Sequence, residues 1–322
     1  MCHETDLPQE LVTMAAIRFA AFDDEHVEEA ATLLATRHAE HRRRQPLLPE
    51  VEDFTALLRS VAEGASGIVA HSGGKLVGYL IGTVKDIAGG AAVWCSPESH
   101  VASDPEHIDD LYAAAASIWV EAGHTRQFVF LPAGSDLIEA WFHLSFGLSG
   151  VLAIRDLSPI PISPSGSSIV VRPSAPDDLA AIARLAHSML EVLRTSPSFD
   201  GRKEITLAEL ESEWSDLWSD GKFTHFVAEL DGAVAGHILM YTRERDLRFG
   251  RGSIDLGNAA TAAEFRGLGV GTAMTAHVID WARQVAFTTM TTDWRTSNLL
   301  ARHFWPKRGF EPAFVRLYRS IP

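Results

Sequence analysis

Residues 253–285 read SIDLGNAATAAEFRGLGVGTAMTAHVIDWARQV and place a glycine-rich turn between a predicted strand and a predicted helix. The β-rich run Ser253–Thr261 predicts the strand, and the apolar spacing of Thr272–Val285 predicts the helix. The motif Arg266–Thr272 lies between them. Its glycines would let backbone N–H groups converge on an anion, and the helix N-terminus would add partial positive charge. The motif predicts a pyrophosphate-binding turn; the alternative is a tight turn in which Arg266 is simply solvated.

Two other phosphate-binding motifs fit this stretch poorly. A Walker loop requires Gly-Lys-Ser/Thr, and no lysine follows Gly271. A dinucleotide fingerprint would need glycine or alanine in place of Thr272 and further β-α units downstream. Asp293 stands at a suitable distance for a ribose ligand, but fewer than about 30 residues follow it. Nucleotide triphosphate chemistry and a nicotinamide-dependent enzyme are both disfavoured.

The rest of the second half alternates helices and strands. Asp231-Gly232 predicts a tight turn between two β-rich runs, which gives an antiparallel hairpin. The other predicted elements are a helix at Asp178–Val192, strands at Thr224–Leu230, Ala233–Thr242, Thr288–Trp294 and Phe314–Arg319, and a helix at Ser297–Phe304. This order predicts a mixed α/β fold.

The first half repeats the second in the same order. Arg18, Asp23 and Asp24 match Arg172, Asp177 and Asp178 at a constant spacing of 154 residues. Later matches, at spacings of 158 to 162, are Gly78 with Gly236, Trp119 with Trp281, Phe142 with Phe304 and Gly147 with Gly309. A drifting spacing indicates duplication followed by loop insertions; chance matching of common residues is the alternative.

The boundary between the repeats follows from composition. SPIPISPSGSS at 158–168 is rich in proline, serine and glycine and predicts a linker. We therefore expect a flexible tail at 1–15, one domain at 16–157, the linker at 158–168 and a second domain at 169–322.

Composition limits the partners and the compartment. The chain has 322 residues, and its formal net charge of -14 argues against nucleic-acid and anionic-membrane surfaces. Only Cys2 and Cys95 are present, which disfavours disulfides and a cysteine-rich zinc site. The first residues lack the basic and apolar parts of an export signal, and we find no apolar stretch of membrane-spanning length. We expect a cytoplasmic protein.

These motifs resemble the GNAT superfamily of acyl-CoA-dependent N-acyltransferases. Arg266–Gly271 is similar to the family's Gln/Arg-x-x-Gly-x-Gly/Ala coenzyme loop. Asn298, Ala301, Phe304, Gly309 and Phe310 are similar to its second signature, an Asn-x-x-Ala helix followed by an aromatic pair and Gly-Phe. The resemblance covers 169–322 well and 17–157 weakly. It implies an α/β (α+β) fold of two tandem GNAT-like domains, as in mycothiol synthases, each a mixed, mostly antiparallel twisted sheet flanked by helices.

The resemblance also implies the coenzyme site. Acetyl-CoA, or another acyl-CoA, would be the co-substrate, with its pyrophosphate on the glycine turn and its pantetheine along the preceding strand; no metal is implied. The implied ligands are Ala260, Thr261, Arg266, Gly267, Leu268, Gly269, Val270, Gly271, Thr272, Asn298, Phe304 and Lys307. For Asn298, a helix cap is an equal alternative.

The catalytic groups are less clear from the sequence. The second aromatic of the signature pair is usually a tyrosine that protonates the departing thiolate, but here it is Trp305, whose indole N–H is not acidic. Tyr318 is a candidate substitute, as are water and unassisted departure of the thiolate. Asp255 stands on the Ser253–Thr261 strand where some family members carry a base, and it is the candidate base. Its alternatives are an exposed strand-end carboxylate or a partner for Arg251. Glu229, His225 and His237 are lesser candidates.

The first half lacks the coenzyme turn. At a spacing of 162, Asp104, His107 and Asp109 stand opposite Arg266, Gly269 and Gly271. Carboxylates would repel a diphosphate, so we expect one active site per chain.

The sequence therefore predicts acylation of a small-molecule primary amine by direct attack in a ternary complex. The acidic chain favours a cationic amine, although the same charge also serves solubility. A non-catalytic acyl-CoA sensor or binding module is the alternative function.

Overall fold

The computed structural model describes residues 17–87, 90–161, 169–199, 204–219 and 221–322. The predicted tail at 1–15 lies outside the described residues, as does 162–168 of the predicted linker. Within the described residues, no helix combines the length and the apolar character needed to cross a membrane.

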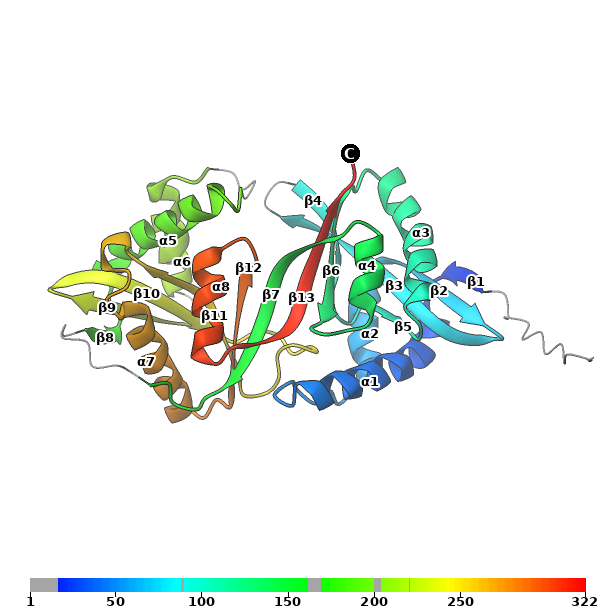
Figure 1. The fold of residues 1–322 in the computed structure, drawn as a ribbon, viewed down its shortest axis with the longest axis horizontal. Coiled ribbons are helices and arrows are strands. Elements are labelled where there is room, and N and C mark those ends of the chain that lie inside the picture. The colour runs from blue at the N-terminus through cyan, green and yellow to red at the C-terminus, as the bar shows by residue number, and fades with distance from the viewer. Residues whose placement is uncertain (1–16, 88–89, 162–168, 200–203, 220) are drawn as a thin grey trace, which may run out of the picture.

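The two halves contain the same succession of elements (Figure 1). The first half consists of β1 (Arg18–Ala21), α1 (Val27–Arg44), α2 (Phe54–Ala62), β2 (Ser66–Ser72), β3 (Lys75–Ile87), β4 (Gly90–Cys95), β5 (His100–Ala102), α3 (Glu106–Glu121), β6 (Arg126–Pro132), α4 (Leu137–His143) and β7 (Gly147–Asp156). The second consists of β8 (Val170–Pro173), α5 (Leu179–Arg194), α6 (Leu207–Ser219), β9 (Phe223–Leu230), β10 (Ala233–Tyr241), β11 (Ser253–Thr261), α7 (Val270–Gln284), β12 (Thr289–Arg295), α8 (Leu299–Phe304) and β13 (Glu311–Ser320). Both β4 and β5 pair with β3, as β11 pairs with β10, so β4 and β5 together correspond to β11. The predicted mixed α/β fold class is confirmed.

One helix of the second half was not predicted from its sequence. Helix α6 begins after Thr206, whose hydroxyl accepts a hydrogen bond from the Glu209 amide at 3.2 Å. The Glu209 carboxylate in turn accepts one from the Thr206 amide at 2.7 Å. This reciprocal pair is a capping box, and Thr-x-x-Glu was the signal that could have revealed the helix.

The last strand of each half lies in the sheet of the other half. The strand order is β1-β2-β3-β4-β6-β13-β7-β12-β11-β10-β9-β8. Thus β13 pairs with β6 of the first half, β7 pairs with β12 of the second, and the two exchanged strands pair with each other. Figure 1 shows β7 and β13 side by side between the two halves. Dividing the chain at the predicted linker, 158–168, therefore does not divide the sheet, because each half contributes a strand to the other half.

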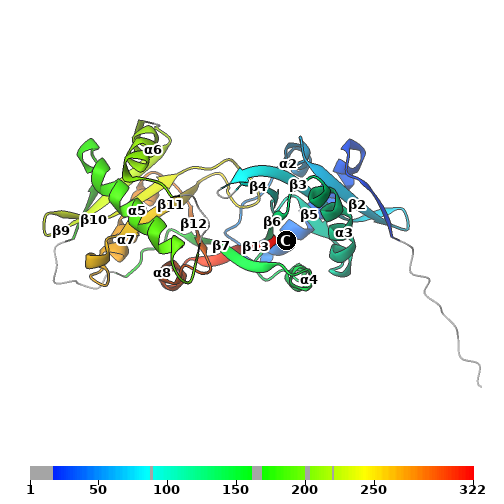
Figure 2. The same cartoon turned by 90° about the horizontal axis from the view of Figure 1, so that it is seen from above.

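Helices cover both faces of the sheet, and the molecule is elongated with a lobe at each end (Figure 2). In the second half, α7 and α8 pack on Ile238 and Met240, whereas α5 and α6 pack on Leu239 of the same strand. Successive strand residues point to opposite faces, which explains this alternation. In the first half, α3 and α4 cover one face, and α1 and α2 cover the other.

The repeated glycines mark equivalent close contacts between helix and sheet. A Cβ on Gly78 would stand 2.9 Å from the Leu111 side chain of α3, and one on Gly236 would stand 2.8 Å from Met274 of α7. Each added Cβ would also meet a backbone carbonyl oxygen, at 3.0 Å from Val101 and at 2.9 Å from Ala260, so both positions disfavour any residue other than glycine. This shared requirement supports the duplication inferred from sequence.

The strand exchange predicts that neither half is stable alone. Expressed separately, 17–161 would expose β7 and the edge of β6, and 169–322 would expose β13 and the edge of β12. We expect each fragment to aggregate, and the co-expressed pair to form a soluble 1:1 complex in size-exclusion chromatography. Two separately soluble fragments that each unfold cooperatively would contradict this expectation.

Candidate functional site

A wedge opens in the sheet where β11 and β12 diverge. The two strands pair in parallel only from Ser253 with Thr289 to Leu256 with Thr292. Directly beyond this point β11 has a bulge, because Leu239 pairs with Asn258 and Met240 with Leu256, which leaves Gly257 without a partner on β10. A bulge bends its strand and changes the local twist. The edge of β11 that faces β12 is consequently free of β12 after Leu256.

The glycine turn continues from the end of this wedge. Gly267 and Gly269 have φ angles of 81° and 93°, in the left-handed region that favours glycine. Helix α7 starts after Gly269, which supplies no side-chain cap. The first amides of an α-helix have no partner within the helix, so this N-terminus presents N–H donors. Gly271 is also constrained, since a Cβ there would lie 3.1 Å from the Phe304 ring.

The wedge and the turn line one continuous cavity of about 440 Å³, called the wedge cavity below. Ten of the predicted coenzyme ligands line it: Ala260, Thr261, Arg266, Gly267, Gly269, Val270, Gly271, Thr272, Asn298 and Phe304. Leu268 and Lys307 stand outside this lining and are exposed. Asn298 also caps α8, because its side-chain oxygen accepts a hydrogen bond from the Ala301 amide at 3.2 Å.

Arg308 is a cavity residue that the sequence analysis missed. Its guanidinium lies 3.8 Å from the centre of the Phe304 ring and donates to the Thr272 hydroxyl at 2.5 Å. Burial lowers the pKa of Arg308. A partly desolvated cation thus stands at the first turn of α7, where an anion would bind. The four-residue spacing from Phe304 was the signal that could have indicated this stacking.

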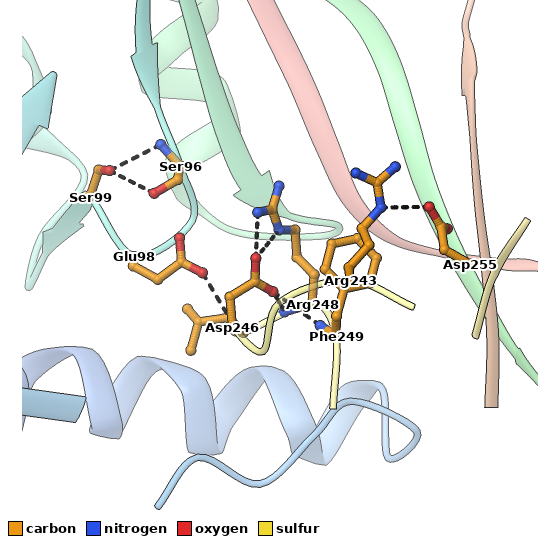
Figure 3. Close-up of polar contacts among 9 residues, drawn as sticks. Ser96, Glu98, Ser99, Arg243, Asp246, Arg248, Phe249 and Asp255 are labelled. Carbon is orange, nitrogen blue, oxygen red and sulfur yellow. Dashed lines mark hydrogen bonds and ion pairs between the residues drawn. The ribbon is translucent and has the colours of Figure 1, made fainter. Parts of the chain in front are cut away.

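Asp255 is tied into a structural network. Its side chain is 3% exposed, one carboxylate oxygen is 2.5 Å from Arg243 Nε, and the other accepts a hydrogen bond from the Thr291 hydroxyl at 2.6 Å. Burial raises the pKa of Asp255, while Arg243 and Thr291 oppose that rise. Figure 3 shows Arg243 directed at this carboxylate. Asp255 lies outside the wedge cavity lining, and its partner is Arg243, where the sequence suggested Arg251.

The structure does not bring Tyr318 to the wedge cavity. Strand exchange places it in β13 opposite Phe128 of β6, with ring centres 4.7 Å apart. Trp305, in contrast, lines the wedge cavity, is 7% exposed and packs on Phe310.

The lesser base candidates are engaged in other contacts. Glu229 pairs with Arg172 at 2.5 Å. His225 Nε2 and His237 Nδ1 are 3.0 Å apart, and burial lowers the pKa of His225 to about 4. None of the three lines the wedge cavity.

The corresponding region of the first half is closed. The connection from β5 to α3 is only 103–105, against 262–269 in the second half. Asp104 accepts a hydrogen bond from the Glu106 amide at 3.0 Å, so a protein carboxylate occupies the helix N-terminus. His100 Nε2 of β5 lies 2.7 Å from the Phe130 carbonyl oxygen of β6, so this side chain bridges β5 and β6. The remaining cavity there is about 40 Å³.

A loop from the second half also seats in the first half. Residues 242–252 join β10 to β11, and Leu247 and Phe249 of this loop belong to the apolar cluster of α1 and α2. The buried Glu98 carboxylate accepts a hydrogen bond from the Leu247 amide at 3.2 Å, and Asp246 pairs with Arg248 beside it (Figure 3). The first half thereby anchors the loop that leads into β11.

Part of the second half matches a protein-family model. Residues 187–310 match the Acetyltransferase (GNAT) family. No curated protein sequence matches the chain.

Similar solved structures agree with this assignment at the level of fold. A tandem GNAT protein from the clavulanic acid biosynthesis pathway is 18% identical, with a TM-score of 0.52 over 95% of this chain and 98% of that one. A GCN5-related N-acetyltransferase from Sphaerobacter thermophilus is 13% identical, with a TM-score of 0.60 over 94% and 95%. A glucosamine N-acetyltransferase region of a fungal multi-domain GH3 β-N-acetylglucosaminidase is 16% identical, with a TM-score of 0.58 over 95% of this chain and 38% of that one. The whole chain therefore has a tandem GNAT fold.

The Arg243–Asp255 pair predicts a pH-dependent loss of stability. We expect Arg243→Gln to lower the unfolding free energy by about 1–3 kcal/mol at pH 7, less than for a fully buried pair because Arg243 is 37% exposed. Without Arg243 the raised pKa of Asp255 rises further, so the folded protein holds a proton that the unfolded chain releases. The deficit should therefore shrink as the pH falls from 7 toward about 4.

Denaturant unfolding at several pH values measures this effect. The double variant Arg243→Gln/Asp255→Asn should show a smaller, pH-independent deficit. A deficit in the single variant that stays constant across this pH range would contradict the prediction.

Proposed function

Because residues 187–310 form a GNAT domain within a tandem GNAT fold, we propose that this protein transfers an acetyl or other acyl group from acyl-CoA to the primary amine of a small molecule. The observation that carries the proposal is the wedge cavity, which joins the free edge of β11 to the uncapped N-terminus of α7. An extended thioester carrier with a diphosphate at one end requires this combination.

The two ends of the wedge cavity suit different parts of acyl-CoA. The amides of Gly267–Thr272 would bind the pyrophosphate, with added positive charge from Arg266 and Arg308. The free edge of β11 at Ala259–Thr261 would hydrogen-bond the pantetheine amides like an added strand. When bound, acyl-CoA supplies a thioester carbonyl that a neutral amine can attack.

The residues of this chain would mainly position the reactants. Among the described residues, those that line the wedge cavity include no carboxylate and no histidine. We therefore assign proton removal from the amine to water, and departure of the thiolate without a side-chain acid. A thiol of pKa about 8.5 is a fair leaving group, so a positioned amine can react without an acid.

The lack of carboxylate and histidine side chains among the described residues of the wedge cavity lining also favours one alternative function. A cavity that binds acyl-CoA but holds no acid or base would also suit a non-catalytic acyl-CoA sensor. The two functions share the coenzyme site and differ in turnover.

Calorimetric titration with acetyl-CoA, combined with a thiol-release assay on a panel of small amines, tests both functions. We expect saturable binding and release of thiol with at least one amine. Binding without turnover across the panel would support the sensor, and absence of binding would overturn both.

Arg308 offers a direct test of the coenzyme site. We expect Arg308→Ala to weaken acetyl-CoA binding about 10- to 100-fold, because a charge-assisted contact of about 1.5–3 kcal/mol is lost. Arg302→Ala removes the same charge from α8 outside the wedge cavity and serves as the matched control. Equal affinities of the two variants in the titration would remove Arg308 from the site.

Asp255→Asn tests the base suggested by the sequence. Since Arg243 and Thr291 already occupy both carboxylate oxygens, we expect kcat to stay within about threefold of wild type. Thiol release under saturating acetyl-CoA measures this. A loss of about 100-fold or more in a variant with unchanged thermal unfolding would restore Asp255 as the base.

A further inference from the structure

A second cavity meets the wedge cavity beside the proposed reaction site. It has a volume of about 520 Å³ and lies between α5, α6 and the strands β10 and β11. Met189 of α5 lines both cavities, and Asn258 in the second is followed along β11 by Ala259 in the first. We call it the side cavity. An inference about its ligand rests on the proposed function, since only then does an acceptor have to reach the thioester.

The lining of the side cavity includes a residue with an unused hydrogen-bond acceptor. The side-chain oxygen of Asn258 is buried and has no hydrogen-bond partner within the described residues. Asn258 pairs with Leu239, which packs with α5 and α6, so its side chain is on the face that carries the side cavity. Buried polar atoms are nearly always satisfied by protein, water or ligand, so this oxygen is an acceptor that an N–H or O–H donor of a ligand can use.

An amine would satisfy this oxygen in a productive orientation. A neutral primary amine has two N–H donors and one lone pair. If one N–H points to the Asn258 oxygen, the lone pair is free to face the neighbouring wedge cavity. The attack forms an N–C bond, breaks the C–S bond, and passes one amine proton to water, which returns a proton to the thiolate.

The other residues that line the side cavity are mainly apolar or acidic. Its floor is apolar and includes Leu210, Trp214 and Leu239, which suits a hydrocarbon chain. Among the described residues, its rim carries four carboxylates, Glu191, Glu204, Glu209 and Glu213, and one cation, Arg194. Arg194 is itself paired with Glu191 at 3.1 Å and lies 3.8 Å from Glu204. The described part of the rim is therefore net negative and favours a positively charged group.

We propose that the acceptor is an aliphatic diamine, with its reacting amine at Asn258 and its second, protonated amine at the glutamate rim. The combination of an unsatisfied oxygen, a buried apolar floor and an exposed acidic rim in one cavity matches an amine, a hydrocarbon chain and a cation. An amine with a carboxylate at its far end would meet like charge at the rim.

Three probes of similar length test the substrate class: 1,5-diaminopentane, pentylamine and 6-aminohexanoate. Calorimetry on the full-length protein saturated with coenzyme A measures their binding, whether or not turnover occurs. We expect the diamine to bind at least tenfold more tightly than pentylamine, and 6-aminohexanoate to bind most weakly. Equal affinities, or a preference for 6-aminohexanoate, would overturn the proposal.

Two variants of α6 locate the cation site. Glu213→Gln should reduce the preference for the diamine over pentylamine by about three- to tenfold. Glu211→Gln, on the same helix but outside the side cavity lining, should leave that preference intact. An unchanged preference in Glu213→Gln would remove this carboxylate from the site.

Two substitutions test the role of the Asn258 oxygen: one removes this oxygen, and the other keeps it. Asn258→Leu should lower kcat, or diamine affinity if turnover is absent, by at least tenfold without changing acetyl-CoA affinity. Asn258→Asp keeps an acceptor oxygen and should recover part of the loss. If wild type fails to bind acetyl-CoA, the proposed function fails; if it binds acetyl-CoA but does not prefer the diamine, only the acceptor assignment fails.

Discussion

Backbone hydrogen bonding between β7 and β13 is the interaction on which the structure depends. Each of these strands borders the half of the sheet that the other half of the chain encodes, and the pairing between them closes the seam. The side chains of the exchanged strands are buried in the core of the opposite half. Phe314 and Leu317 of β13 are fully buried in first-half cores, and Ala153 of β7 is buried in the second-half core. Because edge strands need partners, this exchange makes one continuous sheet from two repeats.

The same framework has diverged into an open site and a closed one. In the second half, the bulge at Gly257 and the long turn 262–269 keep the wedge open toward α7. In the first half, His100 bridges the diverging strands and Asp104 occupies the helix N-terminus. The loop 242–252 then seats against Glu98 and the core of α1 and α2. The first half thus supports the strand that borders the candidate site.

Local patterns in the sequence predicted local structure well. The glycines of the turn, the hairpin at Asp231-Gly232 and the helix of Asp178–Val192 reflect conformational preferences within a few residues, and the repeat order revealed the tandem arrangement. Strand exchange could not be predicted, because either β7 or β13 satisfies the same alternating pattern in either sheet. For that reason the sequence suggested Tyr318 as a candidate acid at the coenzyme site, whereas the structure places it against β6. The contacts of Arg243 and Arg308 join residues that the turns bring together, and charge in a sequence does not reveal its partner.

The interleaved strands also constrain how such a protein can change over generations. A duplicated gene usually leaves one copy free to drift or disappear once its chemistry is lost. Here the first half lends β7 to the second and receives β13 in return, so deleting it would leave β12 without one of its partners and β13 without both of its partners. Selection on the half that carries the candidate site therefore extends to the other half, and the two repeats persist as a single heritable unit.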